Sequence, residues 1–178
     1  MINEKKKVVN WFLVGLMVII SGCGVYTLSG ATLSPDIQTI SIQSFYNDSN
    51  GGPPNMGQLF TNQIRDYYQQ NTSLSLTPDE GHLQLEGSVT GYRLSPVAAT
   101  AAQGQNLTDA SALTRLTITI KVSYVDTTNE ENEFNRTFSF FEDFDNTRDN
   151  LSDVEIELLS NIFEQIILDI FNATVANW

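Results

Sequence analysis

This chain of 178 residues has few of the residues that most often carry out chemistry. It holds a single cysteine, Cys23, and a single histidine, His82. The lone cysteine excludes a disulfide within the chain, and a metal site built on His82 would find no second histidine or cysteine as a co-ligand. The glycines at 51–52 precede two prolines rather than the Lys-Ser of a phosphate-binding loop, and no Gly-x-Ser-x-Gly elbow occurs. We therefore expect a protein that is not an enzyme.

Basic residues are also scarce, with 9 Lys and Arg against 21 Asp and Glu and a formal net charge of −12. Lys5, Lys6, Lys7 and Glu4 all lie within residues 1–22, and without them 6 basic and 20 acidic residues remain, a formal charge of −14. Because proteins hold nucleic acid mainly through basic contacts with phosphates, we expect no nucleic-acid partner. The same acidity repels anionic lipid head groups, so membrane attachment needs another device.

No apolar run reaches the roughly 20 residues that a membrane-spanning helix needs. The most apolar stretch, Val8–Ile20, has 13 residues and lies between the lysine cluster and the small residues Ser21 and Gly22, which precede Cys23. This order is typical of a secretory signal and resembles the bacterial lipobox, in which the cysteine becomes the lipidated first residue. A covalent lipid on Cys23 is then the only attached group that we expect. An ordinary secretory signal and a signal anchor are the alternatives.

The lipobox divides the chain into three parts. They are a lipoprotein signal peptide at 1–22, a lipidated tether at 23–36 and a single domain at 37–178, which is long enough to bury its own core. No acidic cluster follows Cys23, and Gly24 rather than Asp comes next. Both features favour the periplasmic face of the outer membrane.

Hydrophobic periodicity within 37–178 predicts alternating strands and helices. Helical spacing predicts a first helix at Met56–Gln70 and a last helix that begins at the capping box Ser152-x-x-Glu155. The last helix has a wide apolar stripe, which we expect to pack on the sheet. Period-two alternation predicts strands at Ile37–Phe45, Leu83–Val89, Leu116–Tyr124 and Phe134–Phe144, with a further short strand around Leu74 and Leu76.

These elements predict an α+β fold, a two-layer sandwich with two helices packed on one face of a four-stranded β-sheet. The last two strands form an antiparallel hairpin, and the sheet is mixed if the first strand pairs in parallel with a later one through the first helix. Gly87 and Gly91 share the parity of Leu83 and Leu85. We therefore expect both glycines on the buried face, with another element packed closely against them.

Two segments are candidate sites. The carboxylates of Glu142, Asp143 and Asp145 suit calcium, but their spacing matches no known loop and we interpret them as a solvated turn, so no metal is expected.

The segment Pro96–Ala112 has 17 residues and no apolar period, which is long for a loop in a compact domain. It is either a loop that enters a partner or a flexible crossover, and Arg93 and Arg115 flank it.

The order of several short motifs resembles the LPS-assembly lipoprotein family, LptE, in a Bacteroidetes-like form. Each motif is short, but together they span almost the whole mature chain. They are CGVYTLSG at 23–30, TISI at 39–42 leading to Phe45 and Asn47, LQLEGSV at 83–89, RLT at 115–117 and the C-terminal amphipathic helix.

This resemblance implies the same two-helix, four-stranded sandwich and a protein without enzymatic activity. Family members sit inside the outer-membrane β-barrel LptD, where they plug the lumen, help the barrel to assemble and assist insertion of lipopolysaccharide into the outer leaflet. The resemblance thus implies a lipid-anchored protein on the periplasmic side and inside the barrel lumen, with LptD as its partner. Arg93 and Arg115 are our candidates for contact with lipopolysaccharide, although the acidity of the chain opposes binding of an anionic lipid.

Two other functions also fit the residues. A lipid-anchored carrier would have an apolar pocket between sheet and helices, which Gly87 and Gly91 could open. A periplasmic scaffold for another envelope machine, such as a secretin pilot, is excluded only by the family resemblance.

Overall fold

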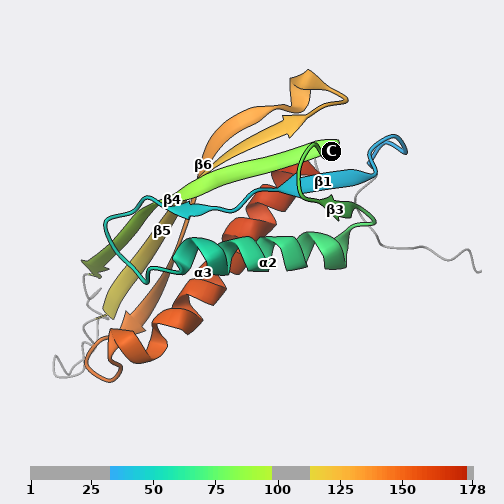
Figure 1. The fold of residues 1–178 in the computed structure, drawn as a ribbon. Helices are drawn as coiled ribbons and strands as arrows, with labels where there is room; N and C mark the ends of the chain where they lie inside the picture. The colour runs from blue at the N-terminus through green and yellow to red at the C-terminus, as the bar shows by residue number, and fades with distance from the viewer. Residues whose placement is uncertain (1–32, 98–112, 176–178) are drawn as a thin grey trace, which may run out of the picture. The chain divides into compact units, whose positions relative to one another are not determined.

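The computed structural model describes residues 33–97 and 113–175. The predicted signal peptide, Cys23 and most of the segment Pro96–Ala112 lie outside these ranges. Within them, no helix combines the length and the apolar character that crossing a membrane requires. The elements shown in Figure 1 are β1 Thr39–Ile42, β2 Tyr46–Asn47, α2 Met56–Asn71, β3 Ser75–Thr77, β4 Leu83–Pro96, β5 Leu113–Asp126, the 3-10 helix η2 Glu130–Asn132, β6 Phe134–Asp145 and α3 Leu151–Thr174.

Two layers make up the described domain, with α2 and α3 on one side of a single sheet (Figure 1). The sheet has the order β3-β1-β4-β5-β6, and β2 pairs with β4. β1 pairs in parallel with β3 and with β4, and β2 is also parallel to β4. β4, β5 and β6 pair antiparallel, which confirms the predicted hairpin. The sheet is therefore mixed, with α2 as the crossover between the parallel strands β1 and β3.

The predicted number of four strands is wrong, because the sheet has six. The first strand breaks after Ile42 and resumes as the two-residue β2. At the break Phe45 turns inward, where its ring packs edge-on against Phe60 at 4.8 Å and its N–H donates to the Thr61 hydroxyl at 2.9 Å. β3 has only three residues. The short strand predicted around Leu74 and Leu76 is therefore present, whereas β2 is too short for a periodic pattern to predict it.

Gly91 does not lie on the buried face, so that prediction is wrong. Val89 pairs with Ile120, whereas Gly91 pairs with Thr119, and the register shifts between these two pairs. The shift is a β-bulge, which inserts one extra residue and exchanges the two faces for all later residues of β4. Gly91 therefore faces the side of the sheet that the helices leave uncovered.

Gly87 does lie on the helix-covered face, as predicted, and close packing explains it. A Cβ atom at this position would overlap the carbonyl oxygen of Lys121 and would lie 2.7 Å from the Phe45 ring. The missing side chain thus makes room for Phe45, whose ring is buried. The space beside Gly87 is filled, and it offers no opening for the apolar ligand of a carrier.

The apolar stripe of α3 is buried, as predicted, and the two helices and the sheet share one core. Edge-on ring contacts join α2 to α3, with Phe60 and Phe163 at 5.2 Å and Tyr68 and Phe171 at 5.3 Å. The Tyr68 hydroxyl also lies 2.5 Å from the hydroxyl of Thr174. Each such buried side chain contributes about 1.5–3 kcal/mol relative to exposure. The buried apolar residues of α3 are Leu158, Leu159, Ile162, Phe163, Ile166, Ile167, Ile170 and Phe171.

The predicted capping box at the start of α3 is wrong. The helix begins at Leu151 and its N-cap is Asn150, so Ser152 already lies in the first turn. Glu155 does not reach back to the cap, because its carboxylate accepts a hydrogen bond of 2.5 Å from the Tyr92 hydroxyl. Burial and the bond to Glu155 raise the pKa of Tyr92. This contact ties the start of α3 to the far end of β4.

Candidate functional site

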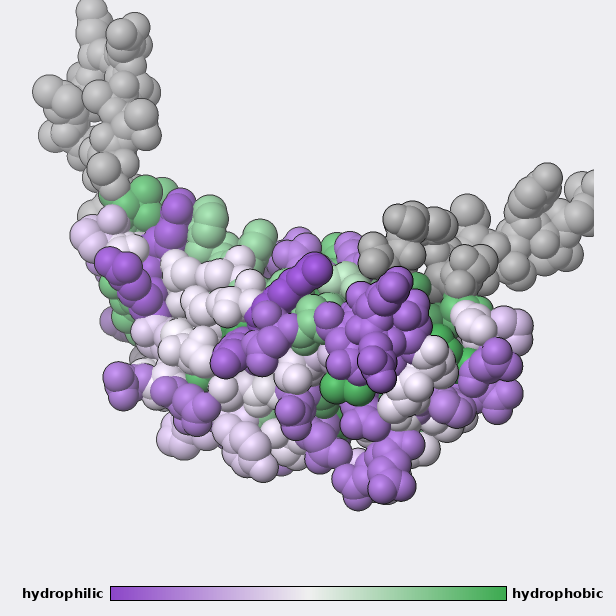
Figure 2. Space-filling model, turned by 90° about the horizontal axis from the view of Figure 1, so that it is seen from above, coloured by the Kyte–Doolittle hydropathy of each residue, from purple (hydrophilic) through white to green (hydrophobic). Residues whose placement is uncertain are grey.

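The sheet face away from the helices is polar. Because side chains alternate along a strand, the residues between the buried positions of β4, β5 and β6 all point to this face. Figure 2, seen from above Figure 1, shows hydrophilic and weakly polar residues over much of the visible surface. The strand residues on this face include Gln84, Glu86, Ser88, Thr117, Thr119, Lys121, Ser123, Asn135, Thr137 and Ser139.

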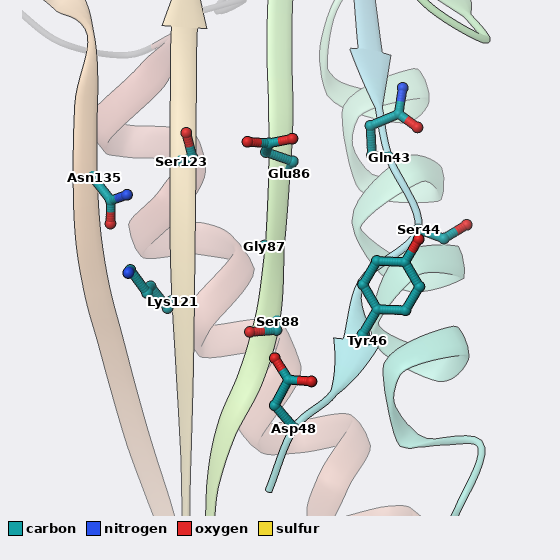
Figure 3. A pocket seen from close by; sticks show the side chains of 10 residues that line it. All are labelled: Gln43, Ser44, Tyr46, Asp48, Glu86, Gly87, Ser88, Lys121, Ser123 and Asn135. Atoms are coloured by element: carbon teal, nitrogen blue, oxygen red, sulfur yellow. The ribbon is translucent and has the colours of Figure 1, made fainter.

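A shallow depression of about 490 Å³ lies on this face. In Figure 3 its side chains stand in front of the strands, with both helices behind. Lys121 is the one cation in its lining, and Glu86 and Asp48 are its anions. Such a surface suits a hydrated polar partner rather than an acyl chain. The lining residues are Gln43, Ser44, Tyr46, Asp48, Glu86, Gly87, Ser88, Lys121, Ser123 and Asn135.

Sequence alternation predicts part of this surface and misses the rest. Lys121 and Ser123 follow from the pattern of β5, in which apolar residues take the other face. Tyr46 and Asp48 come to the face through β2, a strand of two residues that carries no periodic signal. Tyr46 is strongly exposed there, at 70% of its full area.

Arg115 is held by its own neighbours on this face. Its Nε and Nη2 atoms donate to the two carboxylate oxygens of Asp143 at 2.7 and 2.9 Å, and its guanidinium carbon lies 3.6 Å from the centre of the Phe141 ring. The hydrogen bonds from Arg115 hold the pKa of Asp143 below its usual range. The charge of Arg115 is therefore already balanced, which weakens it as a candidate for lipopolysaccharide contact.

Arg93 is the better placed of the two arginines. It pairs with Thr117, while Ser95 pairs with Arg115, so the two arginines are diagonal neighbours on the uncovered face. Arg93 is exposed. Within residues 33–97 and 113–175, Arg93 is part of neither the Arg115–Asp143 ion pair nor the Arg148–Asp145 ion pair. The structure thus brings the two candidates together but leaves them in different electrostatic states.

His82 has a structural partner set. The ring Nδ1 of His82 accepts a hydrogen bond from the backbone N–H of Gln38 at 3.2 Å and lies 3.1 Å from the Thr39 hydroxyl. The backbone N–H of His82 donates to the same hydroxyl at 3.0 Å. These bonds join the start of β4 to the start of β1. The described ranges contain no group of three or more His, Cys, Asp or Glu side chains arranged for a metal.

The three carboxylates near the end of β6 point in different directions. Glu142 accepts from the side chain of Asn161 at 3.1 Å, and Asp143 binds Arg115. Asp145 instead accepts from the backbone N–H of Thr147 at 2.9 Å. They therefore do not converge on one point.

The fold and this polar face can now be compared with known proteins. Residues 37–174 match the family model LptE, described as lipopolysaccharide-assembly. This chain belongs to the LptE family. Membership gives it a role in lipopolysaccharide assembly and confirms the resemblance that its sequence motifs indicate. No curated protein matches the sequence of this LptE family member.

Several solved structures are similar to this chain at low sequence identity. A hypothetical protein from Chlamydia trachomatis is 10% identical, with 79% of this chain and 99% of that chain covered and a TM-score of 0.50. A minor lipoprotein from Acinetobacter baumannii is 13% identical, with coverages of 80% and 95% and a TM-score of 0.49. The rare lipoprotein B from Shewanella oneidensis is 11% identical, with coverages of 75% and 89% and a TM-score of 0.41. The likeness to the Chlamydia trachomatis protein concerns the fold and says nothing of function.

Proposed function

We propose that this LptE family member is an outer-membrane lipoprotein that plugs the LptD β-barrel, helps it to assemble and assists insertion of lipopolysaccharide into the outer leaflet. Its lipid anchor is Cys23, and it works on the periplasmic side and inside the barrel lumen. It acts as a binding and assembly subunit without catalysis, metal or nucleic acid. The family match over residues 37–174 supports this role.

The observation that carries the proposal is the polar, uncovered face of the sheet. The interior of an outer-membrane barrel is polar and filled with water or protein, while its outer surface is apolar. A subunit that fills such an interior needs a broad hydrophilic surface. The uncovered face supplies serine, threonine, asparagine and glutamine side chains over three long strands, while the fully buried apolar residues lie beneath the helices.

Co-purification tests this proposal. The full-length tagged chain is extracted from outer membranes in mild detergent, and the proteins that accompany it are identified by mass spectrometry. We expect one large β-barrel in near-equal amount. A Cys23→Ala chain, produced at the same level, is the control for anchoring. Absence of any barrel from membranes in which the lipidated parent chain is abundant would refute the plug.

We also propose that Arg93 contributes more than Arg115 to contact with lipopolysaccharide. Arg93 is exposed, whereas Arg115 already binds Asp143. Binding of purified lipopolysaccharide to the full chain should weaken with Arg93→Ala and change less with Arg115→Ala. If the double replacement leaves both binding and transport unchanged, the two arginines have no such role.

A further inference from the structure

β6 ends the sheet with a long edge. It has 12 residues and pairs with β5 on one side, and no described strand pairs with its other side. In an antiparallel ladder, every second residue of an edge strand directs its N–H and C=O groups away from the sheet. The edge of β6 therefore presents a row of backbone donors and acceptors.

This edge lacks several of the devices that usually prevent strand pairing. Natural edges are blunted by shortness, proline, a bulge or charged side chains, lysine above all. β6 does carry charges, among them Arg136 and Glu142. β6 contains no proline or lysine, and its register with β5 is continuous from Leu113–Asp145 to Tyr124–Phe134. The opposite edge of the sheet, β3, is protected by its length of three residues. Among the described strands, only β6 thus has an edge suited to extension.

Exposed aromatic side chains lie along the same strand. Phe140 is 37% exposed and Phe141 is 42% exposed, and their rings stack at 5.8 Å. Phe134 and Phe138, on the same face as Phe140, are partly buried against the core. These exposed rings are available for aromatic pairing with a neighbouring strand.

The sequence of β6 is complementary to itself when run antiparallel. A register that places Arg136 opposite Glu142 of a second copy also places Phe138 opposite Phe140 and Phe134 opposite Phe144. All these pairs join residues of the same parity, so the helix-covered faces of both copies stay on one side of the joined sheet. Both opposite-charge pairs and aromatic pairs stabilise antiparallel neighbours.

We propose that the β6 edge is a strand-pairing surface whose partner is a second copy of this chain, joined antiparallel in the register that sets Arg136 against Glu142. Two such ion pairs form per dimer, one on each side of the two-fold axis. Ser139 lies on that axis, opposite its own copy. The proposal does not rest on the role in the barrel, because it concerns the chain when no other protein covers this edge.

Disulfide trapping tests the register directly. Full-length lipidated chain carrying Ser139→Cys is purified in detergent without the barrel, oxidised and run on a non-reducing gel beside the unmodified parent. Thr137→Cys and Phe141→Cys are matched controls on the same face of β6. In the proposed register each of these residues is offset by four residues from the same residue of the second copy, about 14 Å at 3.4 Å per residue. That exceeds the roughly 7 Å between Cα atoms that a disulfide can bridge.

We expect Ser139→Cys to form a disulfide dimer about tenfold faster than either single control. The double variant, which combines Thr137→Cys and Phe141→Cys in one chain, should also form dimers. In the proposed register, position 137 of one copy lies opposite position 141 of the other. Equal trapping by all three single variants would mean random collision and would overturn the proposal. So would a Ser139→Cys chain that stays monomeric.

Charge exchange provides a second test, measured as the amount of the Ser139→Cys disulfide dimer. Adding Arg136→Glu to the Ser139→Cys chain should reduce the dimer by about tenfold, and further adding Glu142→Arg should restore it. Loss of dimer without restoration would overturn the register. Failure of either test leaves co-purification with a barrel unaffected, so the two proposals are separable.

Discussion

Gly87 and Gly91 stand four residues apart in one strand, yet replacing each with alanine should have very different effects. At Gly87 a methyl group would meet the backbone carbonyl of Lys121 and the ring of Phe45, which is itself packed against Phe60. A backbone carbonyl in the middle of a ladder cannot move without breaking strand pairing. At Gly91 the nearest atoms are those of the Thr119 side chain, at 3.0 and 3.1 Å, on the uncovered face.

The size of the difference follows from these contacts. Overpacking a core typically costs about 1–3 kcal/mol, and the immobile carbonyl places Gly87→Ala at the upper end, at about 2–3 kcal/mol. For a chain of this size that corresponds to a fall in Tm of about 4–12 °C. Gly91→Ala should stay within about 1 kcal/mol of the parent, since alanine also has the higher strand propensity.

Urea unfolding followed by circular dichroism measures both variants beside the parent chain. Agreement of the two variants within about 0.5 kcal/mol would refute the bulge and the packing of Phe45 against Gly87. A large loss at Gly91 with none at Gly87 would refute the assignment of the two faces.

Two further predictions concern side-chain contacts. Tyr92→Phe removes the donor to Glu155 and should lower the free energy of unfolding by about 1–2 kcal/mol, whereas Ser152→Ala should change it by less than about 0.5 kcal/mol; equal urea midpoints for the two would argue against the contact. Arg115 lowers the pKa of Asp143, so their pairing stabilises the fold above the carboxyl group's unfolded pKa of about 4 and is lost as pH falls through the lower folded pKa. The stability difference between the parent and Asp143→Asn should be constant above about pH 5 and shrink below about pH 4, and a difference unchanged at low pH would contradict this.

Much of the fold can be predicted from the sequence, because its main elements are long and strongly periodic. The buried stripe of α3 and the alternation of β5 each extend over many residues, so local exceptions do not obscure them. The predicted first helix, Met56–Gln70, ends one residue before the helix in the structure. Parallel pairing of the first strand through this helix was left open by the sequence, and it is what the sheet adopts.

The errors come from single contacts between residues far apart in the chain. The inward turn of Phe45 divides the first strand, and it depends on the ring of Phe60 and the hydroxyl of Thr61. The bulge before Gly91 reverses the faces of β4 without any mark in its composition. Glu155 has the position of a capping residue but finds Tyr92 on the sheet instead. No local pattern reports such contacts.

The candidate site is predictable as a face and not as a set of residues. Alternation in β5 places its threonines and Lys121 opposite the core. The difference between Arg93 and Arg115 depends on Asp143. This residue lies 28 residues from Arg115 along the chain and is its paired neighbour on the adjacent strand. The pairing of β5 with β6 is predicted from sequence, but its register is not, so this ion pair is visible only in the structure.

Depletion of the chain in its native cell tests the central claim most directly. Newly made lipopolysaccharide reaching the cell surface is measured together with the fraction of the partner barrel that is folded, judged by its heat-dependent migration on a gel. The account predicts that both fall as the chain is depleted and that both are restored by the parent chain but not by Cys23→Ala. Normal surface lipopolysaccharide and a normally folded barrel in fully depleted cells would contradict the account.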